Sequence, residues 1–580
     1  MKNNTLVRLL PAWQWLKTYK AADMQADTIA SIIFTIMVIP QSLAYAMLAG
    51  LPAITGLYAS ILPSILYSLF GTSRILAVGP VAITSVMTAS AVLPFATVGT
   101  DQYATIAILL ALLSGTMLLI LSILRLGFLT NLLSHPVISG FISASALLII
   151  LGQVKHLLGI HAYGDTLIPL VSSLAKHLHN TNIPTLVLSI ASIASLVLMK
   201  RYFPSLLKSL GCSPKTVQLF GKSGSILVVA GTTIAVGAFS LDRLGVSIIG
   251  AVPSSIPTLK VSAVNISMLK ELLPSAFLIS IVGFVGSVSV AQTYAAKYRQ
   301  DIDPNQELMG LGMANIGSAL CGAFPVTGGF SRTVLNAESG AKSPMTGIIS
   351  ALLILLTLLF LTPLFYYLPT AILSAIISIS MLKLISIADV KHLWRFSKKE
   401  AILLLVTFFV VLFDGMETGL IAGVVLSLLF FLWHTSHPHI AIVGRVPGTE
   451  HFRNEQRFAV EKHPHILTIR IDENLFFANA RVLEDRLQTI VSQNTDVKHL
   501  ILMCNAVNMI DASAMQSLEK IVVRLADSGV KLHLSEVKGP VMDKLKGSPL
   551  LNTLTGEVFL TQHQAIQKLE KCCGDEQEGK

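Results

Sequence analysis

The fold of this chain is decided by the stretch Ala351-Leu-Leu-Ile-Leu-Leu-Thr-Leu-Leu-Phe-Leu361, which carries no charge and suits a helix exposed to lipid. Similar apolar runs follow one another from about Asp27 to Trp433. A membrane-spanning helix needs about 20 mostly apolar residues, and its backbone polar groups must be paired inside the segment. The chain has 580 residues, of which 13% are charged, and a mean hydropathy of +0.70. We therefore predict a polytopic α-helical membrane protein.

The apolar region divides into about fourteen segments. Their approximate centres are Ile36, Leu62, Ser85, Leu113, Ser143, Ile190, Ala230, Val282, Ile316, Leu335, Ile354, Ile377, Val406 and Val425. The segments near Ser85 and Leu335 are too short to span a bilayer alone.

The basic residues test this division. Starting with the N-terminus inside, loops that fall inside carry fifteen: Arg74, Arg125, Lys200, Arg201, Lys208, Lys215, Lys222, Lys297, Arg299, Lys342, Lys383, Lys391, Arg395, Lys398 and Lys399. Loops that fall outside carry five: Lys155, Lys176, Arg243, Lys260 and Lys270. Because positive residues concentrate in cytoplasmic loops, both termini are expected in the cytoplasm. The net charge of +10 reflects these loops rather than one basic patch, so no nucleic-acid partner is expected.

The two short segments resemble each other. Ile75 to Ser85 has a β-like run, a Gly79-Pro80 break and a helix-like run, and Cys321 to Thr333 repeats this order about 250 residues later. Each is the third segment of its own set of seven, which predicts a 7+7 inverted repeat. Interrupted segments at matching positions of two halves indicate a transporter's binding site. The alternative is a pair of glycine-proline kinks in ordinary membrane helices.

Arg332 lies beside the second break. A charged residue inside a spanning segment is costly and suggests a functional site. If Phe330 begins a half-helix, its free N–H groups and positive dipole end favour an anion. Ser331 would add a hydroxyl donor. The alternatives for Arg332 are a structural pair with Glu338 or snorkelling to the interface, although a spacing of six residues does not put the two on one helix face.

The first segment carries a second polar group. Gln41 and Tyr45 are four residues apart and share a helix face, next to Pro40, which frees backbone groups. They either line a cavity or hold two helices together.

The tail changes character after His434. Strand patterns at His465 to Ile471, Val497 to Cys504 and Val530 to Ser535 alternate with helical ones, and Asp511 is placed to cap a helix. This order predicts a small α/β domain. No phosphate-binding glycine motif is present. We divide the chain into a cytoplasmic N-terminal segment (1–25), a transmembrane domain (26–435), a cytosolic α/β domain (443–570) and a C-terminal tail (571–580).

Several motifs together resemble the sulfate permease family of anion transporters. They are Pro40-Gln-Ser-Leu-Ala-Tyr-Ala46, Gly71-Thr-Ser-Arg74, Gly79-Pro80, Val290-Ala-Gln-Thr-Tyr-Ala-Ala-Lys297, Asp303-Pro-Asn-Gln-Glu307 and Gly328-Gly-Phe-Ser-Arg332. The tail resembles the STAS domain. The resemblance implies core and gate domains, a homodimer, and a substrate site between the third and tenth segments. Carried over, the site consists of Gln41, Tyr45, Val81, Phe330, Ser331 and Arg332, with helix breaks at Gly79, Pro80, Gly328 and Gly329.

Two positions depart from the family pattern. Many bacterial relatives have a glutamate in the eighth segment where this chain has Gly286, so proton coupling is not expected there. Sodium could instead be held by hydroxyls such as Ser287 and Ser289, or Gly286 could serve close helix packing. In the tail, the position after Asp511 is Ala512 rather than a phosphorylated serine, and Ser513 is one place on. Asp511 and Ser513 are the regulatory candidates.

These features predict secondary transport of a small inorganic oxyanion across the inner (plasma) membrane, sulfate before bicarbonate. An anion channel or exchanger of the same fold is the alternative, and a membrane-anchored regulator acting through the tail is a different class. Sodium or a proton is the candidate co-substrate. The helical domain is expected to contact membrane lipid. The segments hold no His, Asp or Glu cluster suited to a metal or a base, so no enzyme activity, metal or cofactor is expected.

Overall fold

The computed structural model describes residues 10–131, 134–164, 166–209, 211, 224–251 and 266–578. The loop residues Lys215, Lys222 and Lys260 lie outside these ranges. The chain forms two compact units, Met1–Ser427 and Leu428–Lys580, and the boundary falls within the last long apolar helix.

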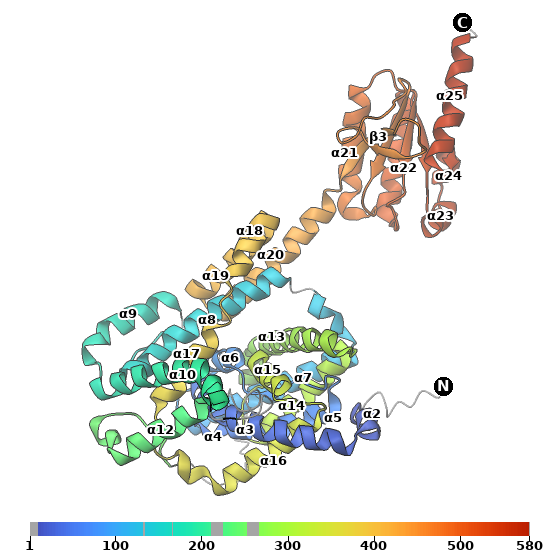
Figure 1. The fold of residues 1–580 in the computed structure, drawn as a ribbon. Coiled ribbons are helices and arrows are strands. Elements are labelled where there is room, and N and C mark those ends of the chain that lie inside the picture. Colours follow the sequence, from blue (N-terminus) through green and yellow to red (C-terminus); the bar gives the residue numbers. More distant parts are fainter. Residues whose placement is uncertain are drawn as a thin grey trace. The chain divides into compact units, whose positions relative to one another are not determined.

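The first unit is helical (Figure 1). Each of the fourteen predicted segment centres lies inside one of its apolar helices or in the last helix, which crosses into the second unit. The helices at these centres are α3 (Ala21–Leu48), α4 (Ile54–Tyr58) with α5 (Leu62–Phe70), α6 (Ala82–Val92), α7 (Asp101–Ile123), α8 (His135–Leu158), α10 (Ile183–Ser209), α12 (Gly224–Ala238), α13 (Ile266–Tyr298), α14 (Pro304–Leu320), α15 (Phe330–Glu338), α16 (Met345–Phe360), α17 (Thr370–Leu382), α19 (Lys398–Asp414) and α20 (Met416–Ser436). Shorter helices are α2 (Ala12–Thr18), α9 (Leu167–His177) and α18 (Ile387–Phe396).

Within the described ranges, seven stretches are long and apolar enough to cross a membrane by length and composition. They are Ala21–Leu48, Asp101–Ile123, His135–Leu158, Ile183–Ser209, Met268–Ala296, Thr370–Phe396 and Met416–Ser436. Local chemistry sets several ends. Thr100 caps α7 by accepting the Tyr103 N–H, and Asp303 caps α14 ahead of Pro304. Gly159 ends α8 with a left-handed φ of 65°.

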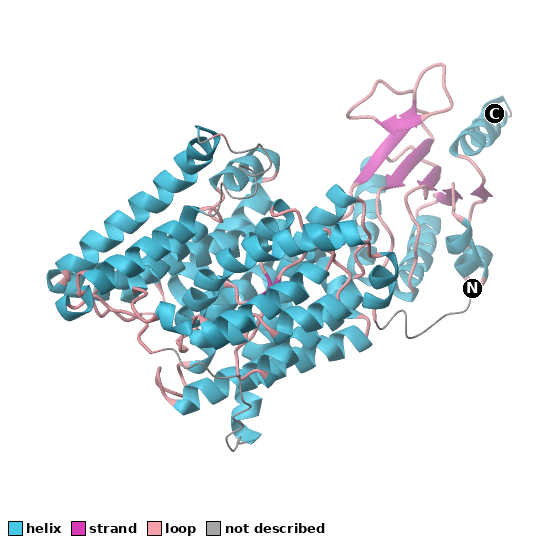
Figure 2. Ribbon diagram, turned by 60° about the horizontal axis from the view of Figure 1, so that its bottom comes forward, coloured by secondary structure: helices cyan, strands magenta, loops and turns pink. Residues whose placement is uncertain are grey.

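The two interrupted segments meet at a pair of short strands. β1 (Val78–Gly79) pairs antiparallel with β2 (Thr327–Gly328), with Val78 opposite Gly328 and Gly79 opposite Thr327. The pair is the small magenta element among the helices of this unit (Figure 2). In an inverted repeat, the two halves have opposite orientations in the membrane, so their equivalent strands run antiparallel. The fold therefore brings together two breaks that lie about 250 residues apart in the chain.

The second unit contains a six-stranded sheet in the order β4-β3-β5-β6-β7-β8. Its strands are β3 (Ile440–Arg445), β4 (Phe452–Asn454), β5 (Ile466–Ile471), β6 (His499–Met503), β7 (Lys531–Ser535) and β8 (Val558–Phe559), and its helices are α21 (Phe477–Gln493), α22 (Ala512–Asp527), α23 (Gly539–Lys546), α24 (Leu550–Thr553) and α25 (Gln562–Glu578). Strands β5 to β8 are parallel, and the predicted strands correspond to β5, β6 and β7.

Two features of this unit differ from the sequence prediction. The antiparallel strands β3 and β4 were not predicted, and β3 begins at Ile440, before the predicted domain boundary at 443. The predicted boundary at 571 falls inside α25, which continues to Glu578. The physical reason is that Ile566, Leu569 and Cys573 lie on one helix face and pack into a core cluster of the sheet.

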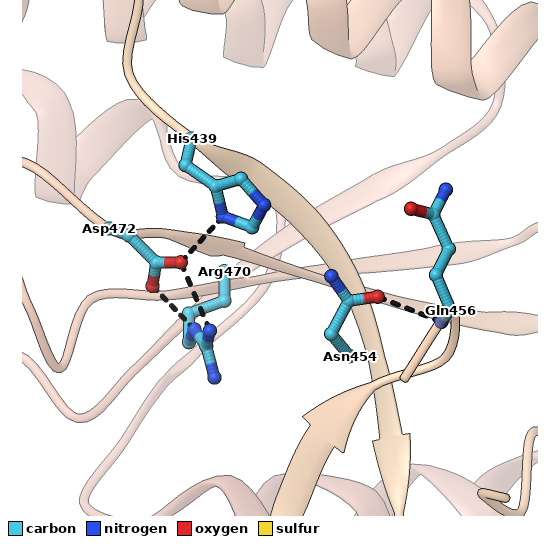
Figure 3. A network of polar contacts seen from close by, with 5 residues as sticks. All are labelled: His439, Asn454, Gln456, Arg470 and Asp472. Carbon is cyan, nitrogen blue, oxygen red and sulfur yellow. Dashed lines mark hydrogen bonds and ion pairs between the residues drawn. The ribbon is translucent and has the colours of Figure 1, made fainter. Parts of the chain in front are cut away.

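A polar contact fixes the start of β3 (Figure 3). His439 Nδ1 lies 2.8 Å from Asp472 Oδ2, and Arg470 donates to both oxygens of the same carboxylate. Burial by itself would raise the pKa of Asp472, but the hydrogen bonds from Arg470 and His439 outweigh it and lower that pKa. The chain entering the sheet is therefore held at its first residues.

Candidate functional site

The candidate site begins where the two half-helices start. Val81 is the N-cap of α6 and Gly329 is the N-cap of α15, and both have extended backbone. A Cβ built on Gly329 would lie 2.9 Å from Val81 Cγ2, so the two helix starts are in contact. Glycine at 329 is what permits this approach.

Both helix starts present unpaired backbone donors at one place. The first helical hydrogen bond of α6 runs from the Ser85 N–H to the Val81 carbonyl (2.9 Å), and that of α15 from the Thr333 N–H to the Gly329 carbonyl (2.9 Å). The N–H groups that precede these bonds have no partner within their helices. Two positive helix ends that meet form a region suited to an anion.

Arg332, in the first turn of α15, adds a full positive charge next to these two helix N-termini. Its side chain is 2% exposed, and its Nη2 donates a 2.7 Å hydrogen bond to Ser42 Oγ on α3. Glu338 is exposed at the far end of α15. The burial of Arg332 argues against snorkelling, and its partner is a hydroxyl rather than a carboxylate. Among the described residues, Arg332 forms no ion pair, which leaves its charge available for an anion.

Gly79 makes room for that guanidinium. A Cβ at Gly79 would lie 2.0 Å from Arg332 Nη1 and 2.9 Å from its Cζ. Its φ is not in the left-handed region, so the glycine is required by space and not by backbone conformation.

The remaining predicted residues surround the helix starts at different depths. Phe330 and Ser331 are exposed, so the described part of the chain leaves the start of α15 uncovered. On α3, Gln41 is half-buried and Tyr45 is 4% exposed. Gln41 Oε1 and Arg332 Nε are buried atoms without a hydrogen-bond partner among the described residues. They leave hydrogen-bonding capacity for a ligand beside the helix starts.

The eighth segment, α13, contacts β2 through one of the two predicted serines. Ser287 Oγ accepts the Gly328 N–H (2.8 Å) and lies 2.8 Å from Thr327 Oγ1. Ser289 is exposed, because two residues along a helix turn the side chain to the other side. The structure therefore brings Ser287 to the site and does not bring Ser289 to it, so the two serines form no common ion site.

Gly286 faces open space. A Cβ at this position would meet no atom of the described residues within 4 Å. Close helix packing, the alternative reason for a glycine here, is therefore wrong. A longer side chain has room at this position.

Two residues of the site were missed by the sequence analysis. Ser42 Oγ accepts the hydrogen bond from Arg332 Nη2. Asn315 on α14 fixes the chain before β2, because its side-chain amide donates to the Val326 carbonyl and accepts the Val326 N–H (both 2.9 Å). The available signal was a buried polar side chain within an apolar segment, which also marks many residues that only join helices.

With this geometry described, comparison with protein families is informative. The model of the sulfate permease family matches residues 24–407, and that of the STAS domain matches residues 457–565. The chain belongs to the sulfate permease family.

Curated relatives extend the match over the whole chain. Sulfate transporter 4.1, chloroplastic, of Arabidopsis thaliana is 35% identical over 96% of this chain and 82% of its own length. A probable sulfate transporter of Mycobacterium tuberculosis is 32% identical over 96% of this chain and 97% of its own length.

Solved structures confirm the fold class. Murine Solute Carrier 26 family member A9, an anion transporter, matches with a TM-score of 0.89 at 24% identity over 98% of this chain and 95% of that one. The transmembrane domain of the cyanobacterial bicarbonate transporter BicA matches with a TM-score of 0.59 at 19% identity over 71% of this chain and 98% of that one. The chain is a polytopic helical membrane protein with a C-terminal STAS domain.

The regulatory candidates lie at the start of α22 in the STAS domain. Asp511 Oδ1 accepts the Ala514 N–H (2.8 Å), and its Oδ2 accepts the Phe477 N–H (2.8 Å) at the start of α21. Asp511 thus joins two helix starts. Ser513 is exposed in the first turn of α22, where an added negative charge would be favoured by the helix dipole.

Proposed function

We propose that this protein carries a small inorganic oxyanion across a membrane by secondary transport. The observation that supports this most directly is the contact between the N-termini of α6 and α15. Backbone N–H groups of both helices converge there with the unpaired charge of Arg332. An oxyanion that leaves water loses many hydrogen bonds, and clustered donors of this kind replace them.

Sulfate is the first substrate and bicarbonate the second. Relatives at 35% and 32% identity are named sulfate transporters or probable sulfate transporters. A more distant structural neighbour is named a bicarbonate transporter. Gln41, Tyr45, Val81, Phe330, Ser331 and Arg332 form the substrate site, with Gly79, Pro80, Gly328 and Gly329 as the breaks that shape it.

Coupling to protons through the eighth segment is not part of this proposal. Gly286 has no titratable group, and the space beside it is empty. This favours sodium coupling or uncoupled exchange over proton symport. With Ser289 turned away, a sodium site would use Ser287 and backbone carbonyls, and an uncoupled exchanger or channel is the second candidate function.

The protein is proposed to lie in the inner (plasma) membrane as a homodimer, with both termini in the cytoplasm. The count of basic loop residues supports this orientation. The STAS domain would then be cytosolic, with Asp511 and Ser513 as regulatory residues.

The decisive experiment is uptake of labelled anions by the purified protein in liposomes. Sulfate and bicarbonate are each offered with a sodium gradient, with a pH gradient and with neither. Saturable sulfate uptake that unlabelled sulfate inhibits is expected, with no accumulation driven by protons alone. Failure to move either anion under any gradient would overturn the proposed function, and uptake only down the anion's own gradient would favour the channel or exchanger.

A further inference from the structure

A buried carboxylate anchors the chain just after the second half-helix. Asp27 on α3 is fully buried and accepts four hydrogen bonds. Its Oδ1 accepts the N–H groups of Lys342 (2.7 Å) and Ser343 (3.3 Å), and its Oδ2 accepts Ser343 Oγ (2.6 Å) and the Tyr19 hydroxyl (3.1 Å). The turn between α15 and α16 is thereby fixed to the first spanning helix.

A second buried carboxylate repeats this arrangement before the first half-helix. Glu307 on α14 is also fully buried. Its Oε1 accepts the N–H groups of Thr72 (2.8 Å) and Ser73 (3.2 Å) and the Thr72 hydroxyl (2.5 Å), and its Oε2 accepts the Tyr67 hydroxyl (2.7 Å). In both cases two consecutive N–H groups, one hydroxyl and one tyrosine bind the carboxylate. The two sites hold the turns that flank the crossing strands.

In each turn a serine hydroxyl also accepts hydrogen bonds from backbone N–H groups that lead into the next element. Ser73 Oγ accepts the Ile75 and Leu76 N–H groups (3.4 and 3.1 Å), which lead into β1. Ser343 Oγ accepts the Met345 N–H (3.2 Å) at the start of α16. The same residue type therefore performs the same task in both halves of the repeat.

Asn336 on α15 connects the two turns. Its Nδ2 lies 2.9 Å from the Ile75 carbonyl and 3.4 Å from Thr346 Oγ1, while Thr346 Oγ1 donates to the Ser343 carbonyl (2.9 Å). The side chain is 4% exposed, and its Oδ1 has no partner among the described residues. A buried amide oxygen without a hydrogen-bond partner destabilises the folded protein, so a ligand for this atom is expected.

The structure contains a cavity of the right size for that ligand. A space of about 20 Å³ is lined by Asn336, Thr346, Ser64, Ser68 and the exposed Arg74. A cavity of more than about 10–15 Å³ holds one water molecule when two to four polar groups surround it. The side chains of Asn336, Thr346, Ser64 and Ser68 carry polar groups of this kind.

We infer that Asn336 and one buried water join the Asp27-anchored and Glu307-anchored turns into a single network that positions α6 and α15 for the anion. Asn336 lies six residues after Phe330, about 9 Å along the helix from its open start. Among the described residues its side-chain hydrogen bonds go to Ile75 and Thr346 and not to a side chain of the substrate site, so it acts as a positioning residue. This inference rests on the proposed function where it concerns the anion.

Transport kinetics test the positioning role. Thr346→Val and Asn336→Leu remove the bridge between the turns and are expected to raise the sulfate KM about tenfold, with kcat changed less than twofold. Thr357→Val is the matched control, because Thr357 lies on α16 with Thr346 and its hydroxyl donates, among the described residues, to the Leu353 carbonyl of its own helix. Variants that lower the melting temperature while keeping the wild-type KM would show a structural role only and would overturn the inference.

A second measurement needs no substrate and separates this inference from the proposed function. Melting temperatures are measured for Ser73→Ala, Ser343→Ala and the double variant of the full chain, with and without Asn336→Leu. Distant sites that share no partner add independently. If the network joins them, the double variant loses less than the sum, and Asn336→Leu restores additivity. Additivity in the wild-type background would overturn the network, even for a protein that moves none of the anions tested.

The water itself is checked in an experimental density map at high resolution. A peak within hydrogen-bond distance of Asn336 Oδ1 is expected in the wild type and is lost in Asn336→Leu. An empty cavity in a well-ordered wild-type map would contradict the water-binding part of the inference.

Discussion

Gly79→Ala tests whether Arg332 must occupy its observed place. The new methyl group would lie 2.0 Å from Arg332 Nη1, whereas real Cβ contacts essentially never fall below 3.0 Å. The guanidinium must therefore move by about an ångström or more. Its neighbours leave little room for this, because Ser42 and Tyr45 on α3 are themselves buried.

The magnitude follows from the hydrogen bond that the movement breaks. Arg332 Nη2 donates to Ser42 Oγ at 2.7 Å, and a hydrogen bond to a charged group contributes about 1.5–3 kcal/mol. If this energy holds the charge in its anion-binding position, apparent affinity for sulfate falls about ten- to hundredfold. The backbone of β1 needs no change, because alanine tolerates its φ.

The assay is concentration-dependent sulfate uptake in liposomes, with melting temperatures of the purified variants measured in parallel. Gly286→Ala is the matched control, since a methyl group there meets nothing within 4 Å. It should keep the wild-type KM. A wild-type KM in Gly79→Ala, or equal damage in both variants, would refute the assignment of Arg332 to anion binding.

Four further predictions follow from the two units. Arg332→Ala should express normally and lose about 2–5 kcal/mol of apparent anion affinity, and wild-type affinity in this variant would contradict its role. At fixed voltage, an inward proton gradient alone should not make the wild-type protein concentrate sulfate, and Gly286→Glu is measured beside it for comparison. Entry of protons together with the anion in the wild type would show that another group carries the proton. A fragment from Pro438 to the C-terminus should be soluble and folded by circular dichroism, whereas one from Val443 should be less stable because it lacks half of β3. Burial and the neighbouring His499 lower the pKa of His533 to about 4, so this fragment should lose up to about 2 kcal/mol of unfolding free energy as pH falls from 6.5 towards 4, and His533→Asn should flatten that profile in denaturant titrations.

The sign of the last prediction follows from linkage. A histidine whose folded pKa is depressed is neutral in the folded protein and binds a proton more readily when unfolded. Its Nδ1 accepts the Glu557 N–H (3.0 Å), and protonation would break that bond. Stability is therefore complete above about pH 6.5 and is lost as the pH falls towards 4. An increase in stability on acidification would contradict this account.

Local sequence patterns were sufficient for most elements of this protein, although they did not predict β3 and β4. The number of spanning segments follows from apolar runs such as Ala351 to Leu361, because burial in lipid requires continuous hydrophobicity. The breaks follow from Gly79-Pro80 and Gly328-Gly329, and the α22 cap follows from Asp511. Each of these signals depends only on residues close to one another in the chain.

The contacts that form the site were decided by tertiary structure. Arg332 meets Ser42 across 290 positions, Asn336 meets Ile75 across 261, and Asp27 meets Ser343 across 316. Helical periodicity states which residues share a face but not which other helix that face contacts. The open space at Gly286 and the crowding at Gly79 show the same point, because two glycines that look alike in the sequence have opposite surroundings. Residue patterns along the chain predicted two matching breaks with an arginine beside one of them. The packing of distant segments decided which side chains surround those breaks, because hydrogen bonds and steric exclusion act over a few ångströms between atoms that the fold brings together.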